Sequence, residues 1–407
     1  MIITSSKIIG FKNDFPATRS GIVIKNGIVV SVGPIPNILK KFPGHQVIHL
    51  ERSVLIPGLI NVHTHLELPP LLETIRSKAF PDWVLNLINA KRELALDDYK
   101  TAAEKNITDI IQTGTTTVAE ICTHNVSPTI LKNGGLRSTI FHEVISMDPL
   151  SPLPGLSTRL SRPSALIRAG LSPHAPHTVS EKALLEIKKF ALHKKIGLCM
   201  HVAESKDEIR LLQRKKSGFE KLYRIAGWNM SWAPLAESPL VYLNKLGLLN
   251  PRFLAVHAVQ ATDKDIEIIR KSGTPIAHCP RSNRETGAGR MRLKEFLDVG
   301  ITVGLGTDSL ASSPSLSMWD EMRYALKIHK KDGITARDIF LLATIGGAKA
   351  LGLDKEVGTL DHGKRADIIA VPLPTKDTGD IYSDLLRETK SCIMTMVNGK
   401  ILYRKQP

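Results

Sequence analysis

The amino-acid sequence predicts an α/β fold, in which a closed barrel of parallel strands lies beside a small β domain. Two observations support this. Strand-like apolar runs alternate with helical segments along the middle of the chain, whereas both ends contain mainly short strands separated by turns. Alternating strands and helices are typical of βα units in a parallel sheet, and eight such units close into a (β/α)8 barrel of the TIM type.

The small domain is expected to be a β-sandwich built from both ends of the chain. Asn-Gly pairs at Asn26-Gly27 and Asn398-Gly399 are strong signals for tight hairpin turns. We predict a small β domain from residues 1–56 and 363–407, and a barrel from residues 57–362. The strand-like runs at the two ends are 2–9, 21–25, 27–32, 46–50, 367–371, 393–397 and 400–403.

The barrel strands are predicted from apolar, β-branched runs bounded by turn residues. A helix is expected after Thr178 and Glu181, which have the spacing of a capping box and precede apolar residues at helical intervals. The strand-like runs are 53–60, 115–120, 137–145, 169–172, 196–201, 253–257, 275–279 and 301–307.

Composition places the chain among ordinary globular proteins, since 42% of its residues are hydrophobic and 23% are charged. No apolar run approaches the ~20 residues of a membrane-spanning helix, and the N-terminus lacks the layout of a secretion signal. The expectation is a soluble, cytoplasmic protein with no membrane partner, and self-association is left open. The four cysteines are scattered singly, which argues against disulfides and against a thiolate zinc site. They are Cys122, Cys199, Cys279 and Cys392.

The formal net charge of +16 has two interpretations, a nucleic-acid-binding face or a solvated basic exterior. Lysines and arginines occur in short, dispersed groups, and no groove-reading or RNA-binding motif accompanies them. We therefore predict no nucleic-acid partner and leave open whether the charge has a function.

Histidine and carboxylate side chains follow the predicted barrel strands. His63 and His65 are alternate residues of one strand, so both imidazoles can face one metal ion. His201 and His257 end two later strands, and Asp308 ends the last. Any one of these could be a buried structural residue. Together they predict a metal centre, because side chains at the carboxyl ends of parallel strands meet at the mouth of a barrel.

Five segments carry a family resemblance. The motifs are PGLINVHTHLEL, SPHAPHTVS, MHVAESKDE, HCPRSN and LGTDSLAS. In this order they resemble the amidohydrolase superfamily, in its branch of chlorohydrolases and nucleobase or nucleoside deaminases. The resemblance extends over essentially the whole chain and implies a metal-dependent aminohydrolase that breaks a C–N bond of a cyclic amidine.

The resemblance also implies roles for matching residues. His63, His65, His201 and Asp308 would bind one divalent metal, zinc or ferrous iron. Glu204 would be the proton shuttle, while His257 would orient water and polarise the substrate. Asp308 would also accept the proton of the attacking water. Relatives with two metals carry a carboxylated lysine where this chain has Ser172-Pro173-His174, which favours a single metal.

Four residues are candidates for substrate recognition. Trp83 could stack on a base or belong to the core, Glu143 could hold sugar hydroxyls, and His174 could bond a ribose or carbonyl. His177 stands where relatives often have tyrosine, so its contact is left open.

The preferred hypothesis is deamination of an adenine-type nucleoside. The motifs look most like relatives that act on 6-amino-6-deoxyfutalosine, an adenine-bearing intermediate of menaquinone synthesis. S-adenosylhomocysteine, methylthioadenosine and adenosine are alternative substrates, and triazine or cyclic-amide hydrolysis is an alternative reaction. From a different class, a basic nucleic-acid-binding protein with a structural metal site would have no need of Glu204.

Overall fold

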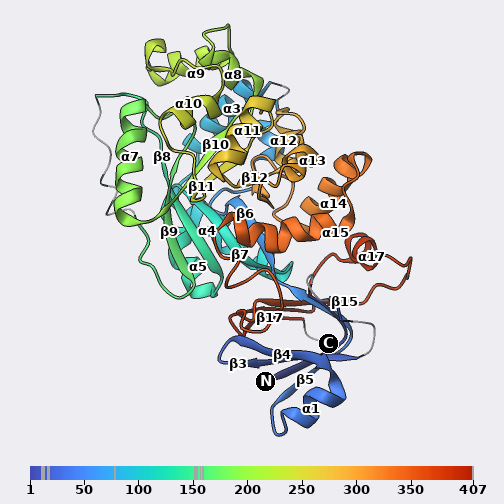
Figure 1. Cartoon of the computed structure of the whole chain (residues 1–407). Coiled ribbons are helices and arrows are strands. Elements are labelled where there is room, and N and C mark those ends of the chain that lie inside the picture. The colour runs from blue at the N-terminus through green and yellow to red at the C-terminus, as the bar shows by residue number, and fades with distance from the viewer. Residues whose placement is uncertain are drawn as a thin grey trace.

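The computed structural model describes residues 1–10, 14–15, 19–77, 79–150, 155, 157 and 160–405. Two separate sheets organise these residues (Figure 1). One is parallel and lies within the helical part of the molecule. The other combines strands from both ends of the chain, and the N- and C-terminal labels lie together at this smaller sheet, below the barrel.

The parallel sheet curls into the predicted barrel. Its strands neighbour one another in chain order from β6 to β13, and short β14 pairs back to β6. Since only Gly306 and Thr307 separate β13 from β14, these two form one interrupted eighth strand that closes the sheet. The strands are β6 (Leu59–His65), β7 (Thr115–Cys122), β8 (Arg137–Val144), β9 (Ile167–Pro173), β10 (Gly197–Val202), β11 (Phe253–His257), β12 (Ile276–His278), β13 (Val303–Leu305) and β14 (Asp308–Ser309).

One predicted strand was wrong in its bounds. The run 53–60 is divided at Gly58: β5 (Val47–Pro57) belongs to the small sheet, and β6 begins the barrel at Leu59. A side chain at position 58 would overlap Thr116, so the chain passes between the two sheets at a residue without one. The Gly58 N–H donates to the carbonyl of Asp367, which ties the crossing to the small sheet.

Helices surround the barrel, and the predicted cap of one of them was also wrong. Helix α7 begins after Ser180, whose hydroxyl accepts the Ala183 N–H, whereas Thr178 bonds back to His174 and Ala175. Both residues match the capping chemistry, and only the conformation distinguishes them. The main helices of the barrel are α3 (Phe80–Arg92), α4 (Leu96–Gln112), α5 (Ser127–Gly134), α7 (Glu181–Lys194), α8 (Lys206–Leu212), α9 (Phe219–Ala226), α10 (Pro239–Lys245), α11 (Asp263–Ser272), α12 (Pro280–Glu285), α13 (Leu293–Asp298), α14 (Met318–His329), α15 (Ala336–Leu341) and α16 (Gly347–Ala350).

The smaller sheet has the strand order β17-β16-β15-β5-β1-β3-β4, with β2 paired to β1. Both predicted Asn-Gly turns form: Asn26 and Gly27 have φ of 53° and 74°, and Asn398 and Gly399 have 50° and 79°. Its strands are β1 (Ile2–Ile9), β2 (Asp14–Phe15), β3 (Ser20–Lys25), β4 (Ile28–Pro34), β5, β15 (Ile368–Pro372), β16 (Met394–Val397) and β17 (Lys400–Arg404), with helices α1 (Ile35–Lys41) and α17 (Ile381–Glu388) nearby.

A buried ion pair joins the barrel to the small sheet. Arg137, at the start of β8, donates through Nε and Nη2 to the Asp367 carboxylate at 2.8 and 3.1 Å, and both side chains are almost fully buried. Asp367 also accepts the Asn398 N–H at 2.7 Å. The pair therefore fixes both the barrel strand and the C-terminal hairpin.

We expect Arg137→Ala to lower the free energy of unfolding by about 3–5 kcal/mol, because it leaves a buried carboxylate without its cation. The midpoint of urea unfolding, followed by circular dichroism, measures this loss. Arg168→Ala is the matched control, since Arg168 also pairs with a carboxylate, Glu356, but is 45% exposed. That variant should change stability by less than about 1 kcal/mol. Equal losses in the two variants would contradict the assignment.

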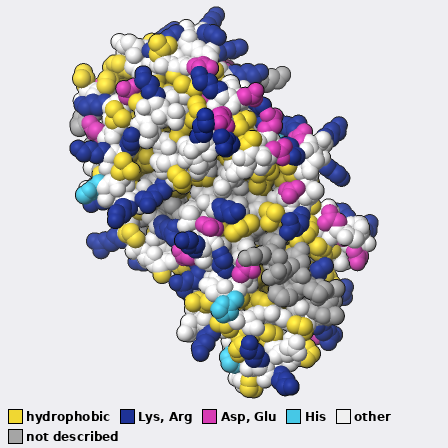
Figure 2. All heavy atoms as spheres, viewed as in Figure 1, with side chains coloured by type: hydrophobic (Ala, Val, Ile, Leu, Met, Phe, Trp, Pro, Cys, Tyr) yellow, Lys and Arg dark blue, Asp and Glu magenta, His cyan; other side chains and the backbone are white. Residues whose placement is uncertain are grey.

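No described helix combines the length and the apolar character needed to cross a membrane. On the face seen in Figure 2, lysine and arginine side chains are spread widely, with acidic side chains among them. This distribution fits a solvated basic exterior on that face better than one continuous basic groove.

Candidate metal centre and active site

The residues with candidate functions lie at the carboxyl ends of four barrel strands. His63 and His65 lie at the end of β6, His201 near the end of β10, and His257 at the end of β11. Asp308 lies in β14, the last part of the interrupted eighth strand. The parallel register brings these ends to one mouth of the barrel. That mouth faces away from the small sheet, toward α3, α8 and α9 (Figure 1).

The backbone is strained where it presents these side chains. Ala203, His257, Ala258 and Asp308 have φ values of 51°, 74°, 47° and 59°. The left-handed region costs a residue with a side chain of order 1–3 kcal/mol, and such strain gathers at functional sites. Here each unfavourable φ falls next to a candidate functional group, so the fold holds the site at the expense of local conformational energy.

The ligand atoms are close enough to share one ion. The nitrogens of His63, His65 and His201 lie within 4.8 Å of one another, and so do the ligand atoms of His63, His257 and Asp308. The Nε2 atoms of His63 and His201 are 3.2 Å apart. Two nitrogens on a tetrahedral zinc would be separated by roughly 3.3 Å, given zinc–nitrogen bonds of 2.0–2.1 Å. The residues therefore fit a divalent metal with imidazole and carboxylate ligands.

Neighbouring groups aim the rings and the carboxylate. Nδ1 of His201 donates to the carbonyl of His174 at 3.0 Å, which leaves its Nε2 as a lone-pair donor facing His63. The Oδ2 atom of Asp308 accepts the Ser282 hydroxyl at 2.6 Å, while its Oδ1 lies 3.7 and 3.5 Å from Nε2 of His63 and His65. Such outer contacts are typical of metal sites, because they fix the tautomer and the direction of each ligand.

Burial keeps the imidazoles of His63 and His65 neutral, as metal ligands must be. It lowers the pKa of His63 to about 4 and that of His65 to about 3. For Asp308, burial alone would raise the pKa, but the facing histidines hold it well below its usual value. The cluster therefore offers neutral nitrogens and one carboxylate anion at neutral pH.

Glu204 lies beside this cluster but is not one of the proposed metal ligands. Its Oε1 is 3.5 Å from Nε2 of His257, whose Nδ1 bonds to Oδ1 of Asn283 at 2.8 Å. Burial raises the pKa of the Glu204 carboxyl well above its ordinary value, and the negative charges of Asp308 and Glu208 raise it further. A carboxyl group with a raised pKa can donate a proton at neutral pH and take it back.

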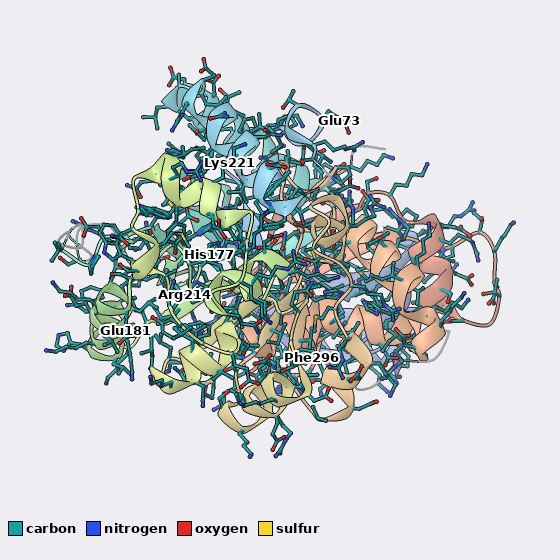
Figure 3. The ribbon with its side chains drawn as sticks, turned by 90° about the horizontal axis from the view of Figure 1, so that it is seen from above. Glu73, His177, Glu181, Arg214, Lys221 and Phe296 are labelled. Carbon is teal, nitrogen blue, oxygen red and sulfur yellow. The ribbon has the colours of Figure 1, made fainter. Side chains whose placement is uncertain are left out.

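One pocket contains nearly all the residues singled out in the sequence. His63 is the exception, since it is fully buried and does not line the pocket. In Figure 3, which looks at the barrel from above, His177 lies closer to the middle of the view than Glu181 at the start of α7. The predicted residues that line the pocket are His65, Trp83, Glu143, His174, His177, His201, Glu204, His257 and Asp308.

The four predicted substrate contacts are held in different ways. The Trp83 indole N–H donates to the carbonyl of Ala311 at 3.3 Å. The Trp83 side chain is buried and also lines the pocket. Glu143 accepts the Thr123 hydroxyl at 2.9 Å. The ring of His174 bonds to Thr178 at 2.8 Å. The ring of His177 packs on Phe219 with centroids 4.4 Å apart.

Glu67 supports the pocket by holding a loop in place, a role that was not predicted from the sequence. Its buried carboxylate accepts the backbone N–H groups of Thr123, His124, Val126 and Ser127, and the Ser127 hydroxyl, at 2.6–3.0 Å. These bonds hold the loop after β7, which carries Thr123 into the pocket. Its place two residues after His65 was the only signal in the sequence.

Glu208 was also missed. Its carboxylate accepts the N–H groups of Ala203 and Glu204 at 3.2 and 2.8 Å, and so fixes the strained turn that presents Glu204. Burial raises the pKa of Glu208 to about 7. The spacing Ser205-x-x-Glu208 matches the sequence pattern of a capping box, and Ser205 does cap α8, so this pattern could have drawn attention to Glu208.

Comparison with known proteins agrees with this fold. The chain is 29% identical to a 5-methylthioadenosine/S-adenosylhomocysteine deaminase of Moorella thermoacetica, over 95% of this chain and 92% of the relative. Its fold is similar to that of the Helicobacter pylori aminofutalosine deaminase in complex with methylthio-coformycin (TM-score 0.86, 24% identity, 98% and 99% of the two chains). It is also similar to an adenosine deaminase from Xanthomonas campestris with bound zinc (TM-score 0.83, 22% identity, 98% and 92%).

The family assignment rests on a longer match. Residues 54–402 match the family described as the amidohydrolase family, a range that includes every barrel strand and the C-terminal strands of the small sheet. The protein is therefore a hydrolytic enzyme, and the chain belongs to the amidohydrolase family.

Proposed function

We propose that the protein is a metal-dependent hydrolytic deaminase of an adenine-type nucleoside. The observation that carries this proposal is Glu204, a buried carboxyl with a raised pKa that shares one pocket with His257 and the histidine–aspartate cluster. A structural metal site does not need a proton-carrying group beside the metal ligands. A deaminase does, because its leaving group departs only after it is protonated.

One divalent metal, zinc or ferrous iron, would be held by His63, His65, His201 and Asp308. When bound, it would supply Lewis-acid activation of a water molecule. Nitrogen-rich ligand sets suit both ions. Ser172-Pro173-His174 ends the fourth barrel strand, β9, without the lysine that a second metal would need, so the proposal is limited to one ion.

The chain's own residues account for the proton transfers. In hydrolytic deamination, water adds its oxygen to the ring carbon that carries the amino group, a ring nitrogen gains a proton, and the carbon–nitrogen bond breaks as ammonia leaves. Glu204 would donate its proton to the ring nitrogen, regain one from the hydroxyl group that the added water becomes, and deliver that proton to the amine. The proton taken up by Asp308 would then return to Glu204 and restore both residues. His257, with its Nδ1 bonded to Asn283, would keep Nε2 directed at this reaction space. Asp308, ionised in the site, would take the proton that water loses.

For the substrate we propose 6-amino-6-deoxyfutalosine, which would place the enzyme in menaquinone synthesis. The fold similarity to an aminofutalosine deaminase supports this choice together with the sequence motifs. The second candidate is methylthioadenosine or S-adenosylhomocysteine, favoured by the 29% identity to the Moorella thermoacetica enzyme. All these compounds present the same adenine ring, so they differ only at the far end of the pocket.

The test is ammonia release by the metal-loaded protein from these three nucleosides and from adenosine. We expect a kcat/KM of about 10⁴ M⁻¹s⁻¹ or more on at least one of them, in the ordinary enzymatic range. Activity on 6-amino-6-deoxyfutalosine alone would support the menaquinone assignment. Activity on none of the four, with the metal present, would refute the nucleoside deaminase proposal and direct attention to triazines and cyclic amides.

A further inference from the structure

Helix α3 presents one continuous face to the pocket. Its pocket-lining residues recur at intervals of three or four, so they form a single stripe along the helix. The members of this α3 stripe are Phe80, Trp83, Val84, Leu87, Ile88 and Lys91. Five of the six are apolar, and the stripe ends in a cation.

The two ends of the α3 stripe lie at different parts of the site. Trp83 bonds to the carbonyl of Ala311, close after Asp308 and so near the metal ligands. Lys91 follows eight residues later, about 12 Å farther along the helix axis. Burial is the main cause of the lowered pKa values of His174 and His124, and the positive charge of Lys91 lowers them further. Against the effect of burial, His174 and then Lys91 lower the pKa of Glu143. Lys91 therefore lies at the opposite end of the stripe from Trp83, within electrostatic reach of Glu143 near the end of β8.

Lys91 is half-buried, yet in the part of the chain that the structure describes its ammonium forms no ion pair. The Glu143 carboxylate lies within electrostatic reach of this ammonium but forms no ion pair with it, so the ammonium stays available to the anionic group of a ligand. A lysine in the last turn of a helix also interacts favourably with the helix dipole. Arg92 can serve that purpose equally well, and it is exposed and outside the stripe. The dipole therefore does not explain why the cation faces the pocket.

The walls near Lys91 are mostly apolar. Leu87 and Ile88 lie one turn before it, and Ile145, Leu222 and Trp228 line the same pocket. Such a wall fits a hydrocarbon or aromatic segment, while one ammonium fits one monoanionic group at its end. A phosphate would require more donors than a single lysine. A carboxylate is the anion that this arrangement suits best.

We propose that Lys91 is a specificity-determining residue, which binds a carboxylate carried by an apolar substituent on the far side of the nucleoside from its amino group. The inference rests on the proposed function and narrows it. It favours adenine nucleosides with an acidic substituent, such as 6-amino-6-deoxyfutalosine and S-adenosylhomocysteine. Nucleosides without a carboxylate, such as methylthioadenosine and 5′-deoxyadenosine, would offer Lys91 no anionic group to bind.

The test compares Lys91→Ala with the wild type on both groups of nucleosides. We expect kcat/KM to fall about 10- to 100-fold on the carboxylates, mainly through KM, because a charge-assisted hydrogen bond is lost. On the nucleosides without a carboxylate it should change by less than about threefold, within the range of an untouched contact. Lys91→Arg should retain most of the activity. Arg92→Ala, which removes a neighbouring charge outside the stripe, is the matched control and should behave as wild type.

The results that would contradict the inference can be distinguished from those that would contradict the proposed function. Equal losses on both groups would make Lys91 a structural residue and overturn the inference, while the proposed function would stand. A wild type that prefers nucleosides without a carboxylate would also overturn it. A wild type that deaminates neither group would refute the proposed function itself. Calorimetric binding of the deaminated product should show the same 10- to 100-fold weakening in Lys91→Ala, independently of turnover.

Discussion

Glu204→Gln is expected to lower kcat by about 10²- to 10⁴-fold, the contribution of a positioned proton-transfer group. Glutamine has nearly the same shape as a protonated glutamate, so the buried site should remain packed. It cannot, however, lose and regain a proton. The variant should therefore keep its metal and its fold while turnover of the preferred nucleoside almost ceases.

Three measurements on the variant separate these effects. Metal content by mass spectrometry and the thermal unfolding midpoint should match the wild type, and only the rate of ammonia release should fall. Glu186→Gln is the matched control, because Glu186 is an exposed residue of α7 that undergoes the same chemical change. Normal turnover in Glu204→Gln would show that Glu204 is not the proton carrier.

The raised pKa of Glu204 depends on residues far apart in the sequence. Burial comes from the closure of the barrel, the Asp308 charge comes from the last strand, and Glu208 holds the turn from α8. No local pattern in the segment 201–204 contains these influences. The sequence predicted Glu204 as the proton carrier, but the burial and charges that raise its pKa come from the closed barrel.

The barrel itself could be predicted because its strands are buried on both faces and appear as apolar runs in order. The β11 strand was predicted with its bounds, Phe253–His257. The error at Gly58 arose because the end of β5 and the start of β6 read as one apolar run. Nothing in that run says that its two halves pair with different strands, since strand pairing depends on the whole topology.

Parts of the site could not be predicted because the role of these residues depends on where the fold directs their side chains. Lys91 and Arg92 are adjacent cations in the sequence, and only the rotation of α3 places one in the pocket and the other in solvent. Glu67 likewise acts through backbone groups of a loop more than 50 residues away. By contrast, His63 and His65 are separated by one residue on a strand, so their common face followed from strand geometry alone.

The barrel closure also explains why a small residue stands before the last ligand. A side chain at Gly306 would overlap His63 and Cys279, so the eighth strand can approach the first only with glycine there. This approach brings Asp308 opposite Thr64, beside the two histidines of β6. The proposed ligand set is thus completed by the same contact that closes the sheet.

His201→Ala is expected to remove metal binding and activity together. The Nε2 atom of His201 lies 3.2 Å from that of His63, within the proposed ligand set. Metal content should fall well below one ion per chain, and ammonia release should fall with it. His193→Ala, a substitution of an exposed histidine on α7, should change neither.

Stability against added metal gives a second measurement, which does not depend on turnover. Metal at about 100 times its Kd should stabilise the metal-free wild type by about 2.7 kcal/mol, because the ion binds only the folded chain. In His201→Ala this stabilisation should nearly disappear, for zinc and for ferrous iron alike. A buried histidine with a purely structural role would lower the unfolding midpoint of the variant but leave the response to metal intact. A variant that remains fully loaded and active would remove His201 from the ligand set, and the three remaining residues would then have to hold the ion alone.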